Sequence, residues 1–316
     1  MHTARSRTQR RPAPMSEASS GPMSGVELFT PREIAAAVRS TGVSKATAPA
    51  GATFVLGVLA GAFIALGGVL ATVISTGSTL GFGPTRWLAG LGFSLGLILV
   101  IVAGAELFTG NTLVVMGWVS RRITLGTLAR NWAIVYAGNV VGALSVAVMV
   151  VLAGWWEQDE AALGGTALTI AAGKAGLSFT AVFIRGILAN ALVCLAVWLA
   201  AGGRTLVDKI VAIVFPIAAF VAAGFEHSIA NLYFLPVGLL IEHEPTARDA
   251  ATLSPAQLAN LDVAGALRNV IGSTLGNVVG GAVLVGLVYW FVYLRPGSRP
   301  EEEAQGEEEV EEEGER

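Results

Sequence analysis

Gly104-Ala-Glu-Leu-Phe-Thr-Gly-Asn111 and Gly224-Phe-Glu-His-Ser-Ile-Ala-Asn231 align without a gap, with Gly, Glu and Asn at the same positions. Each stretch lies in the middle of a long apolar run. A charge inside a membrane helix costs roughly 2.5–3.5 kcal/mol on insertion scales, so both glutamates must face protein or water. Irregular backbone at that depth is tolerated only inside protein or along a cavity. We therefore predict two interrupted membrane helices whose breaks face the interior of the fold.

Two further pairs of segments recur in the same order around these stretches. Gly57-Val-Leu-Ala-Gly-Ala-Phe-Ile-Ala-Leu66 matches Gly186-Ile-Leu-Ala-Asn-Ala-Leu-Val-Cys-Leu195. Gly138-Asn-Val-Val-Gly142 matches Gly276-Asn-Val-Val-Gly280, and each is preceded by an Asn at the same spacing. Each copy carries an odd number of apolar runs, so the second copy must enter the membrane upside down. Inverted repeats of this kind place transport sites near the bilayer midplane.

The composition is that of a membrane protein. Apolar residues make up 53% of the 316 residues and charged residues only 14%, whereas a soluble domain carries about 25% charged residues. A membrane helix needs about 20 mostly apolar residues. We therefore expect an all-α polytopic membrane protein with six transmembrane helices in an inverted three-plus-three repeat, the second and fifth of them interrupted. The six apolar runs cover residues 52–75, 87–118, 128–155, 176–200, 210–241 and 266–294.

Basic residues indicate the orientation, because cytoplasmic loops collect Lys and Arg. With both ends inside, the outer loops and adjoining helix ends hold only Arg86, Lys174, Arg248 and Arg268. We expect a multi-pass protein of the plasma membrane whose two termini are cytoplasmic. The basic residues on the inner side are Arg32, Arg39, Lys45, Arg121, Arg122, Arg130, Arg204, Lys209, Arg295 and Arg299.

The two ends of the chain differ from its middle. Residues 1–26 are rich in Arg, Ser and Pro and lack the apolar stretch of a signal peptide. Residues 296–316 hold ten of the 23 acidic residues. We expect two disordered tails around one transport domain, residues 27–295. The scattered basic residues give no reason to expect a nucleic-acid partner.

The segment before the first run predicts a helix. Thr30 suits the N-cap, Pro31 the first helical position, and Glu33 completes a capping box. The helix either lies on the cytoplasmic face of the membrane or serves as a plain lead-in to the first span. Its weak apolar stripe consists of Ile34, Ala35, Val38 and Val43.

His227 carries the most distinctive chemistry at the breaks, because it is the one histidine within an apolar segment. Neutral imidazole offers one N–H donor, and imidazolium offers two donors and a positive charge. An anion that enters a dry constriction loses its hydration, and a donor at that point offsets the loss. Thr109, at the matching break, could donate the opposing hydrogen bond. We therefore predict that both line a path for a small solute.

Other residues near the breaks have structural interpretations as well as functional ones. Glu106 and Glu226 either accept hydrogen bonds from backbone amides freed at the breaks or relay protons. The aromatic and aliphatic residues that precede the breaks either pack or act as gates; they are Phe93, Leu97 and Phe220. Asn111 and Asn231 are expected to tie the breaks together, whereas Asn139 and Asn277 are expected to pack helices against each other.

Nothing in the sequence indicates an enzyme or a metalloprotein. The single cysteine, Cys194, excludes a disulfide framework and a Cys-based zinc site. No nucleophile–base pair, metal-ligand cluster or phosphate-binding loop is apparent. We expect no catalytic activity, no metal and no cofactor.

From about Phe29 to Arg295 the chain resembles the formate/nitrite transporter family. The run Phe225-Glu-His-Ser-Ile-Ala-Asn231 is the most specific mark, supported by Asn131-Trp132, Tyr136-Ala-Gly-Asn139 and Gly186-Ile-Leu-Ala-Asn190. The resemblance implies an aquaporin-like six-helix fold in the lipid bilayer. It also implies a homopentamer with one pore in each protomer.

The resemblance further implies roles for single residues. His227 would be the central pore histidine facing Thr109, Lys174 would attract anions to an outer vestibule, and the helix after Thr30 would be a mobile gate. An outer constriction would consist of Phe93 and Phe220. An inner constriction would consist of Leu97, Leu107, Phe108 and Val193. Two further residues would lie near the central site, Asn190 and Asn231.

The function that this implies is transport of a small monovalent anion, with formate preferred over nitrite and hydrosulfide. Passive and proton-coupled flux both stay open at this stage. A channel for water or glycerol is an alternative, although the chain has no Asn-Pro-Ala motif at its breaks. An intramembrane enzyme, or a scaffold for the acidic tail, is a third.

Overall fold

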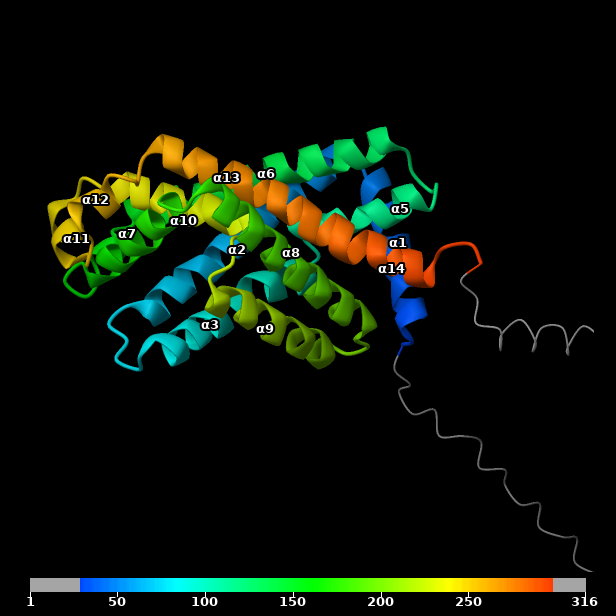
Figure 1. Cartoon of the computed structure of the whole chain (residues 1–316), viewed down its shortest axis with the longest axis horizontal. Helices are drawn as coiled ribbons and strands as arrows, with labels where there is room; N and C mark the ends of the chain where they lie inside the picture. Colours follow the sequence, from blue (N-terminus) through cyan, green and yellow to red (C-terminus); the bar gives the residue numbers. More distant parts are fainter. Residues whose placement is uncertain (1–28, 298–316) are drawn as a thin grey trace, which may run out of the picture.

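The computed structural model describes residues 29–297, and every regular element among them is a helix (Figure 1). Six helical segments are long and apolar enough to cross a membrane. The predicted all-α class and the six candidate spans are therefore confirmed. Except for Pro296 and Gly297, the expected tails lie outside the described residues. The spans are α2 (Ala50–Ser75), α3 (Phe82–Ala103), α6 (Leu125–Leu152), α8 (Phe179–Gly202), α9 (Leu206–Ala223) and Val263–Tyr293.

The helix predicted before the first span is α1 (Pro31–Thr47). Its capping box is confirmed: Thr30 Oγ1 accepts from the Glu33 amide at 3.3 Å, and Glu33 Oε2 accepts from the Thr30 amide at 2.7 Å. The Thr30 amide and hydroxyl lower the pKa of Glu33 below its ordinary value. The apolar stripe is narrower than expected, since Ile34 and Val43 are only half-buried. Its buried residues are Ala35, Val38, Gly42 and Ala46.

Helices α3 and α9 both end at a glycine in the left-handed region, Gly104 with φ 79° and Gly224 with φ 74°. Glycine takes this conformation without the steric cost that other residues meet, and it therefore ends helices. After each glycine the chain is non-helical for a few residues. Helix then resumes as α4 (Phe108–Asn111), η1 (Thr112–Val114) and α5 (Val115–Val119), and in the second case as α10 (Ser228–Ile241).

One substantial helix was not predicted, α7 (Ala162–Ala175). Its 14 residues extend only about 21 Å, too short for a hydrocarbon core of about 30 Å. It packs on α10 through a cluster that includes Leu168, Ala171, Tyr233 and Leu235. Short elements also contact α7, namely η2 (Trp155–Glu157), α11 (Pro245–Ala250) and α12 (Pro255–Leu258).

The last span is not a uniform α-helix as the sequence suggested. It consists of α13 (Val263–Val278), the π-helical η3 (Val279–Leu287) and α14 (Val288–Tyr293). Gly281 in η3 leaves no room for a side chain, because a Cβ there would collide with Thr112 and Asn190. The lack of a side chain at Gly281 therefore lets the last span approach the segment that follows the first break.

In Figure 1, α6 and α13 run along one long side of the molecule and α3 and α9 along the other, with α2 and α8 between them. Helices α7, α11 and α12 lie at one end, and α1, α5 and α14 lie at the opposite end. Both described ends of the chain therefore emerge on the same side. Large apolar residues such as Phe82, Leu152 and Val207 are more than 60% exposed. Such a surface needs lipid or another subunit to cover it.

Candidate functional site

The backbone of the first break is held by Asn139. Its Oδ1 accepts from the Phe108 amide at 2.8 Å, and its Nδ2 donates to the carbonyls of Glu106 at 2.9 Å and Gly57 at 2.7 Å. The Glu106 carboxylate points elsewhere: it accepts from Asn111 Nδ2 at 2.6 Å and lies 3.0 Å from Lys45 Nζ. Asn139 is thus the hydrogen-bond acceptor of the Phe108 amide, which the break leaves outside the helical hydrogen-bond pattern.

The second break has the same arrangement around Asn277. Its Oδ1 accepts from the Ser228 amide at 2.9 Å, and its Nδ2 donates to the carbonyls of Glu226 at 3.0 Å and Gly186 at 2.8 Å. The Glu226 carboxylate accepts from Asn231 Nδ2 at 2.8 Å and lies 3.1 Å from Lys174 Nζ. The two breaks are therefore built from matching polar networks.

These networks correct two expectations. One of the two interpretations of the glutamates had them accept hydrogen bonds from backbone amides at the breaks, yet the described contacts of their carboxylates are to Asn and Lys side chains. Asn139 and Asn277 do more than pack helices, because they take the amide acceptor role themselves. The reason is chemical: an Asn on the neighbouring span can both accept and donate, whereas a carboxylate can only accept.

The two breaks meet at Thr109 and His227. Thr109 Oγ1 lies 2.9 Å from His227 Nε2, and both residues are buried. His227 Nδ1 accepts from the Ala230 amide at 3.1 Å, so His227 caps the start of α10. A nitrogen that accepts cannot carry a hydrogen, so the ring hydrogen sits on Nε2 and is donated to Thr109. The Thr109 hydroxyl hydrogen is then available to another acceptor.

The carbonyl of Thr109 is fixed from the other side. Asn190 Nδ2 donates to it at 3.2 Å, and Thr112 Oγ1 donates to it at 2.6 Å. Asn190 also donates to the Asn277 carbonyl at 2.6 Å. One amide thus links the first break to the residue that supports the second break.

Helix dipoles add a positive potential at this point. The helical segments that begin at Phe108 and Ser228 both start at the breaks. The N-terminus of a helix carries roughly half a positive charge because its first amides lack partners within the helix. Two such ends near Thr109 and His227 favour an anion over a cation.

Aromatic and aliphatic side chains enclose the pair. Phe93 and Phe220 meet edge to face with ring centroids 5.6 Å apart, and the Phe220 ring lies 5.9 Å from the His227 ring. Phe108 turns away from this contact and packs against Tyr136 at 4.9 Å. The remaining expected constriction residues belong to the same buried cluster, namely Leu97, Leu107 and Val193.

A cavity of about 350 Å³ opens on one side of the pair. Phe93, Phe220 and His227 lie in its wall. Lys174 lies there too, joined by Arg86 and Arg185, against the single carboxylate of Glu226. Among the described lining residues, positive charges therefore outnumber negative ones.

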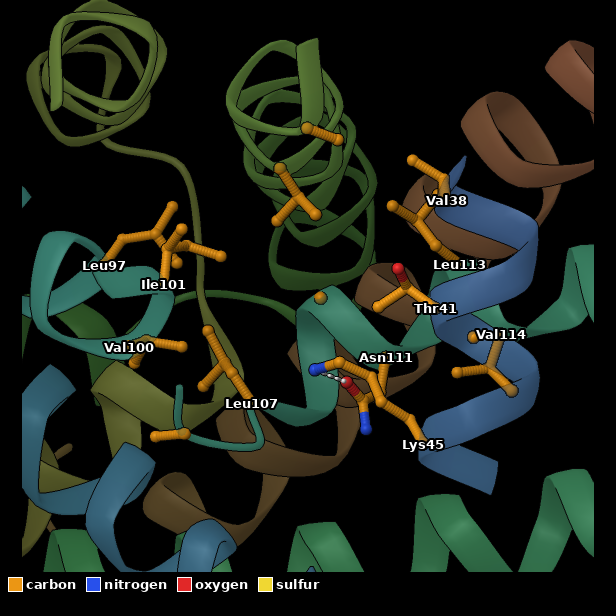
Figure 2. Close-up of a pocket in the computed structure, with 15 residues that line it drawn as sticks. Val38, Thr41, Lys45, Leu97, Val100, Ile101, Leu107, Asn111, Leu113 and Val114 are labelled. Carbon is orange, nitrogen blue, oxygen red and sulfur yellow. Dashed lines mark hydrogen bonds between the residues drawn. The ribbon is translucent and has the colours of Figure 1, made fainter. Parts of the chain in front are cut away.

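A second cavity of about 90 Å³ lies on the other side, between α1, α3, α8 and the first break. Figure 2 shows Leu97 and Leu107 at one edge of it and Lys45, hydrogen-bonded to Asn111, at the other. Thr109 lines neither cavity, although its neighbour Gly110 lines this one. His227 lines the first cavity, and its partner Thr109 directly precedes Gly110, which lines the second.

A sequence profile described as "Formate/nitrite transporter" matches residues 32–291. This chain belongs to the formate/nitrite transporter family. Membership confirms that the chain is a membrane transporter and not an enzyme. No cluster of His, Cys, Asp or Glu that could hold a metal ion occurs among residues 29–297.

Relatives and solved structures of this transporter family cover most of the chain. The formate channel FocA of Escherichia coli K12 is 42% identical over 273 residues, which cover 85% of this chain and 96% of that protein. A probable formate transporter of Methanothermobacter thermautotrophicus is 39% identical, and the alignment covers 86% of this chain and 99% of that protein. A structure titled "Pentameric formate channel with formate bound" aligns with a TM-score of 0.72 at 38% identity, over 78% of this chain and 98% of that one.

Three basic residues of this transporter were missed as site residues, Lys45, Arg86 and Arg185. Lys45 precedes Gly57 by the same interval as Lys174 precedes Gly186, so the repeat could have revealed it. Arg185 is a charge within an apolar run, which is a signal of function in itself. Arg86 donates to the carbonyl of Val221 at 2.6 Å, a contact that only the folded chain shows.

Proposed function

We propose that this transporter carries formate through a path inside each protomer, with His227 and Thr109 at its centre. The observation that supports it best is the 2.9 Å contact between Thr109 Oγ1 and His227 Nε2, because His227 lines one cavity and the neighbour of Thr109, Gly110, lines the other. A carboxylate that arrives there can replace Thr109 as the acceptor of the Nε2 hydrogen. The freed Thr109 hydroxyl can then donate to the other carboxylate oxygen.

The remaining named residues have roles in the same path. Lys174 draws anions into the outer vestibule, while Phe93 and Phe220 form its constriction. Leu97 and Leu107 form the inner constriction, supported from behind by Phe108 and Val193. Asn190 holds the Thr109 carbonyl, and Asn231, Glu106 and Glu226 belong to the polar networks that hold the breaks.

Proton coupling is part of the proposal, with His227 as the group that exchanges the proton. It is the one imidazole in the described walls of the two cavities. In imidazolium both ring nitrogens donate, so proton uptake at Nδ1 breaks the bond from the Ala230 amide and loosens the start of α10. Anion transfer and a small movement at the second break would then be linked.

We also propose that residues 27–295 form an inverted repeat with two interrupted spans, in which α1, α2, α3 and α6 correspond to α7, α8, α9 and α13. The matching networks of Asn139 and Asn277, and of Lys45 and Lys174, support this pairing. Both termini face the cytoplasm of a plasma-membrane protein, in keeping with the basic residues at the α1 and α14 end.

The assembly is proposed to be a homopentamer with the lipid bilayer around it. The neighbouring structure titled a pentameric formate channel supports this, as do the many exposed apolar side chains of the spans. Native mass spectrometry of the solubilised protein should give the mass of five chains, and a different dominant mass would reject the pentamer.

Uptake of labelled formate into proteoliposomes tests the function directly. Unlabelled nitrite, nitrate and sulfide are added as competitors, because nitrite and hydrosulfide have the same charge and similar size. Formate should be displaced least well by nitrate, whose conjugate acid is strong. His227→Asn should change the pH profile of uptake. An unaltered rate and pH profile in that variant would contradict the proposed role of His227.

A further inference from the structure

A third cavity lies at the end of the molecule that carries α1 and α14. It has a volume of about 480 Å³ and lies between α1, the end of α5 and the end of α14. It is separate from the two cavities that flank Thr109 and His227. Its lining consists of Arg39, Val119, Ser120, Arg121, Arg122, Trp290, Leu294 and Pro296. We call it the arginine pocket.

The pocket gathers positive charge without a counter-charge. Arg39 is half-buried, Arg121 and Arg122 are exposed, and within residues 29–297 none of their side chains forms an ion pair or a hydrogen bond. The Ser120 hydroxyl in the same wall is buried and has no hydrogen-bond partner in the described part of the chain. A buried polar group without a partner is uncommon in folded proteins. The pocket thus offers donors to an anionic group.

The backbone conformation at Arg121 does not require an arginine. Arg121 has φ 57°, in the left-handed region, where it ends α5. The Arg121 amide donates to the Trp118 carbonyl at 2.8 Å, and the Arg122 amide donates to the Gly117 carbonyl at 2.9 Å. Glycine is the residue favoured at such a helix end. The geometry of the turn therefore does not account for the presence of an arginine at this position.

We propose that the glutamate-rich C-terminal segment of this same chain, residues 301–315, docks in the arginine pocket. Pro296 is part of the pocket wall and Gly297 is the last described residue, so the described chain ends at the rim of the pocket. Glu301 follows Gly297 by four residues, a reach of about 14 Å in extended chain. Ten Glu lie between Glu301 and Glu315. Arginine and carboxylate form short, often bidentate pairs, so the charges match.

Docking of this segment would tie the end of the chain to α1. Arg39 lies on α1, one residue from Val38, which lines the second cavity, of about 90 Å³, called the inner cavity below (Figure 2). A Glu bound to Arg39 and Arg122 together would bridge α1 to the end of α5. The docked segment thereby holds α1 against the inner cavity, whichever solute the transporter carries.

Zero-length crosslinking of the full-length protein tests the proposal. A carbodiimide joins a carboxylate to an amine in direct contact, so Arg122→Lys places a reactive amine in the pocket. Arg130→Lys is the matched control, because Arg130 is exposed on the first turns of α6 and does not line the pocket. The two variants are compared in nanodiscs of phosphatidylcholine at low salt.

Peptide mass spectrometry should find the lysine introduced at position 122 joined to Glu301–Glu303 several-fold more often than the lysine introduced at position 130. High salt should reduce the product at position 122, because it screens exposed charges. Arg121→Gly suits the backbone of the turn, so its fold is not at risk. Adding this change to Arg122→Lys should weaken the product, since it removes one of the charges that hold the segment.

Three results would overturn the proposal. One is equal crosslinking of the two introduced lysines. Another is coupling of the glutamates chiefly to the amino group of Met1, which would assign the segment to the basic N-terminal stretch. A third is loss of the product in nanodiscs that contain phosphatidylglycerol, which would assign the pocket to a lipid phosphate.

Discussion

Lys45 Nζ lies 3.0 Å from Glu106 Oε1, and this contact joins α1 to the first break. Lys174 and Glu226 form the matching contact at the second break, at 3.1 Å. The two ion pairs differ in burial. The side chains of Lys45 and Glu106 are 31% and 10% exposed, whereas those of Lys174 and Glu226 are 18% and 3% exposed. Their energetic weight should differ accordingly.

Lys174→Met should destabilise the protein by about 3–5 kcal/mol, because it leaves the buried Glu226 carboxylate without its cation. Lys45→Met should cost only about 1 kcal/mol, since solvent reaches that pair. Unfolding by sodium dodecyl sulfate, followed by circular dichroism, measures both. Adding Glu226→Gln should recover most of the loss caused by Lys174→Met. A larger loss for Lys45→Met would show that burial does not rank the pairs.

Asn139→Leu should destabilise the fold by several kcal/mol, because three buried backbone groups lose their partner at about 1–3 kcal/mol each. Asn277→Leu should behave alike, since its three hydrogen bonds match those of Asn139. Ser145→Ala on the same helix is the control: its hydroxyl bonds only to the carbonyl of Val141 at the exposed surface. Thermal melting of the purified protein ranks the variants, and a control as unstable as Asn139→Leu would refute the account.

Thr109→Val should slow formate uptake about tenfold, the equivalent of about 1.4 kcal/mol for one hydrogen bond lost to the solute. Valine has nearly the same shape but neither accepts from His227 nor donates. Thr109→Ser keeps the hydroxyl and should retain most of the uptake. Labelled formate in proteoliposomes supplies the rate. Equal rates for the Val and Ser variants would exclude a role of the hydroxyl.

Gly142→Ala should destabilise the packing of α2 on α6 by about 1–3 kcal/mol or more, because inserted atoms strain a close-packed core. A Cβ there would collide with the carbonyl oxygen of Val58. Gly51→Ala, at the start of α2, is the control, since a Cβ there meets nothing within 4 Å. The yield of folded protein after extraction in mild detergent should fall for Gly142→Ala alone.

The first turn of α1 should loosen at acidic pH. The Thr30 amide and hydroxyl hold the pKa of Glu33 below its ordinary value of 4.5. The cap therefore stabilises the helix at neutral pH, and this contribution disappears as the pH falls through the lowered pKa. Amide exchange at the start of α1, corrected for the intrinsic pH effect, should rise in that range. Glu33→Gln should lose this dependence, whereas exchange in the middle of α1 should be unaffected.

The six spans and the two polar stretches were readable from the sequence because membrane insertion depends on local properties. The length of a run, its apolar character and the cost of a buried charge are properties of a single segment. Each membrane span can therefore be recognised from its own residues. The repeat supplied the correspondence between Glu106 and Glu226 by spacing alone. The N-cap of α1 was readable for the same reason, since Thr30, Pro31 and Glu33 lie within one turn.

What the tertiary structure decided involves partners far apart in the chain. No local rule pairs Asn139 with the Phe108 amide or Lys45 with Glu106, because these contacts depend on how α6 and α1 pack on the break. Helix α7 is too short to be recognised in the sequence as a membrane span, and it is stabilised by its packing on α10. The arginine pocket brings together residues of α1, α5 and α14. The sequence by itself thus determined which segments cross the membrane and where they break, and only packing decided which side chains hold those breaks together.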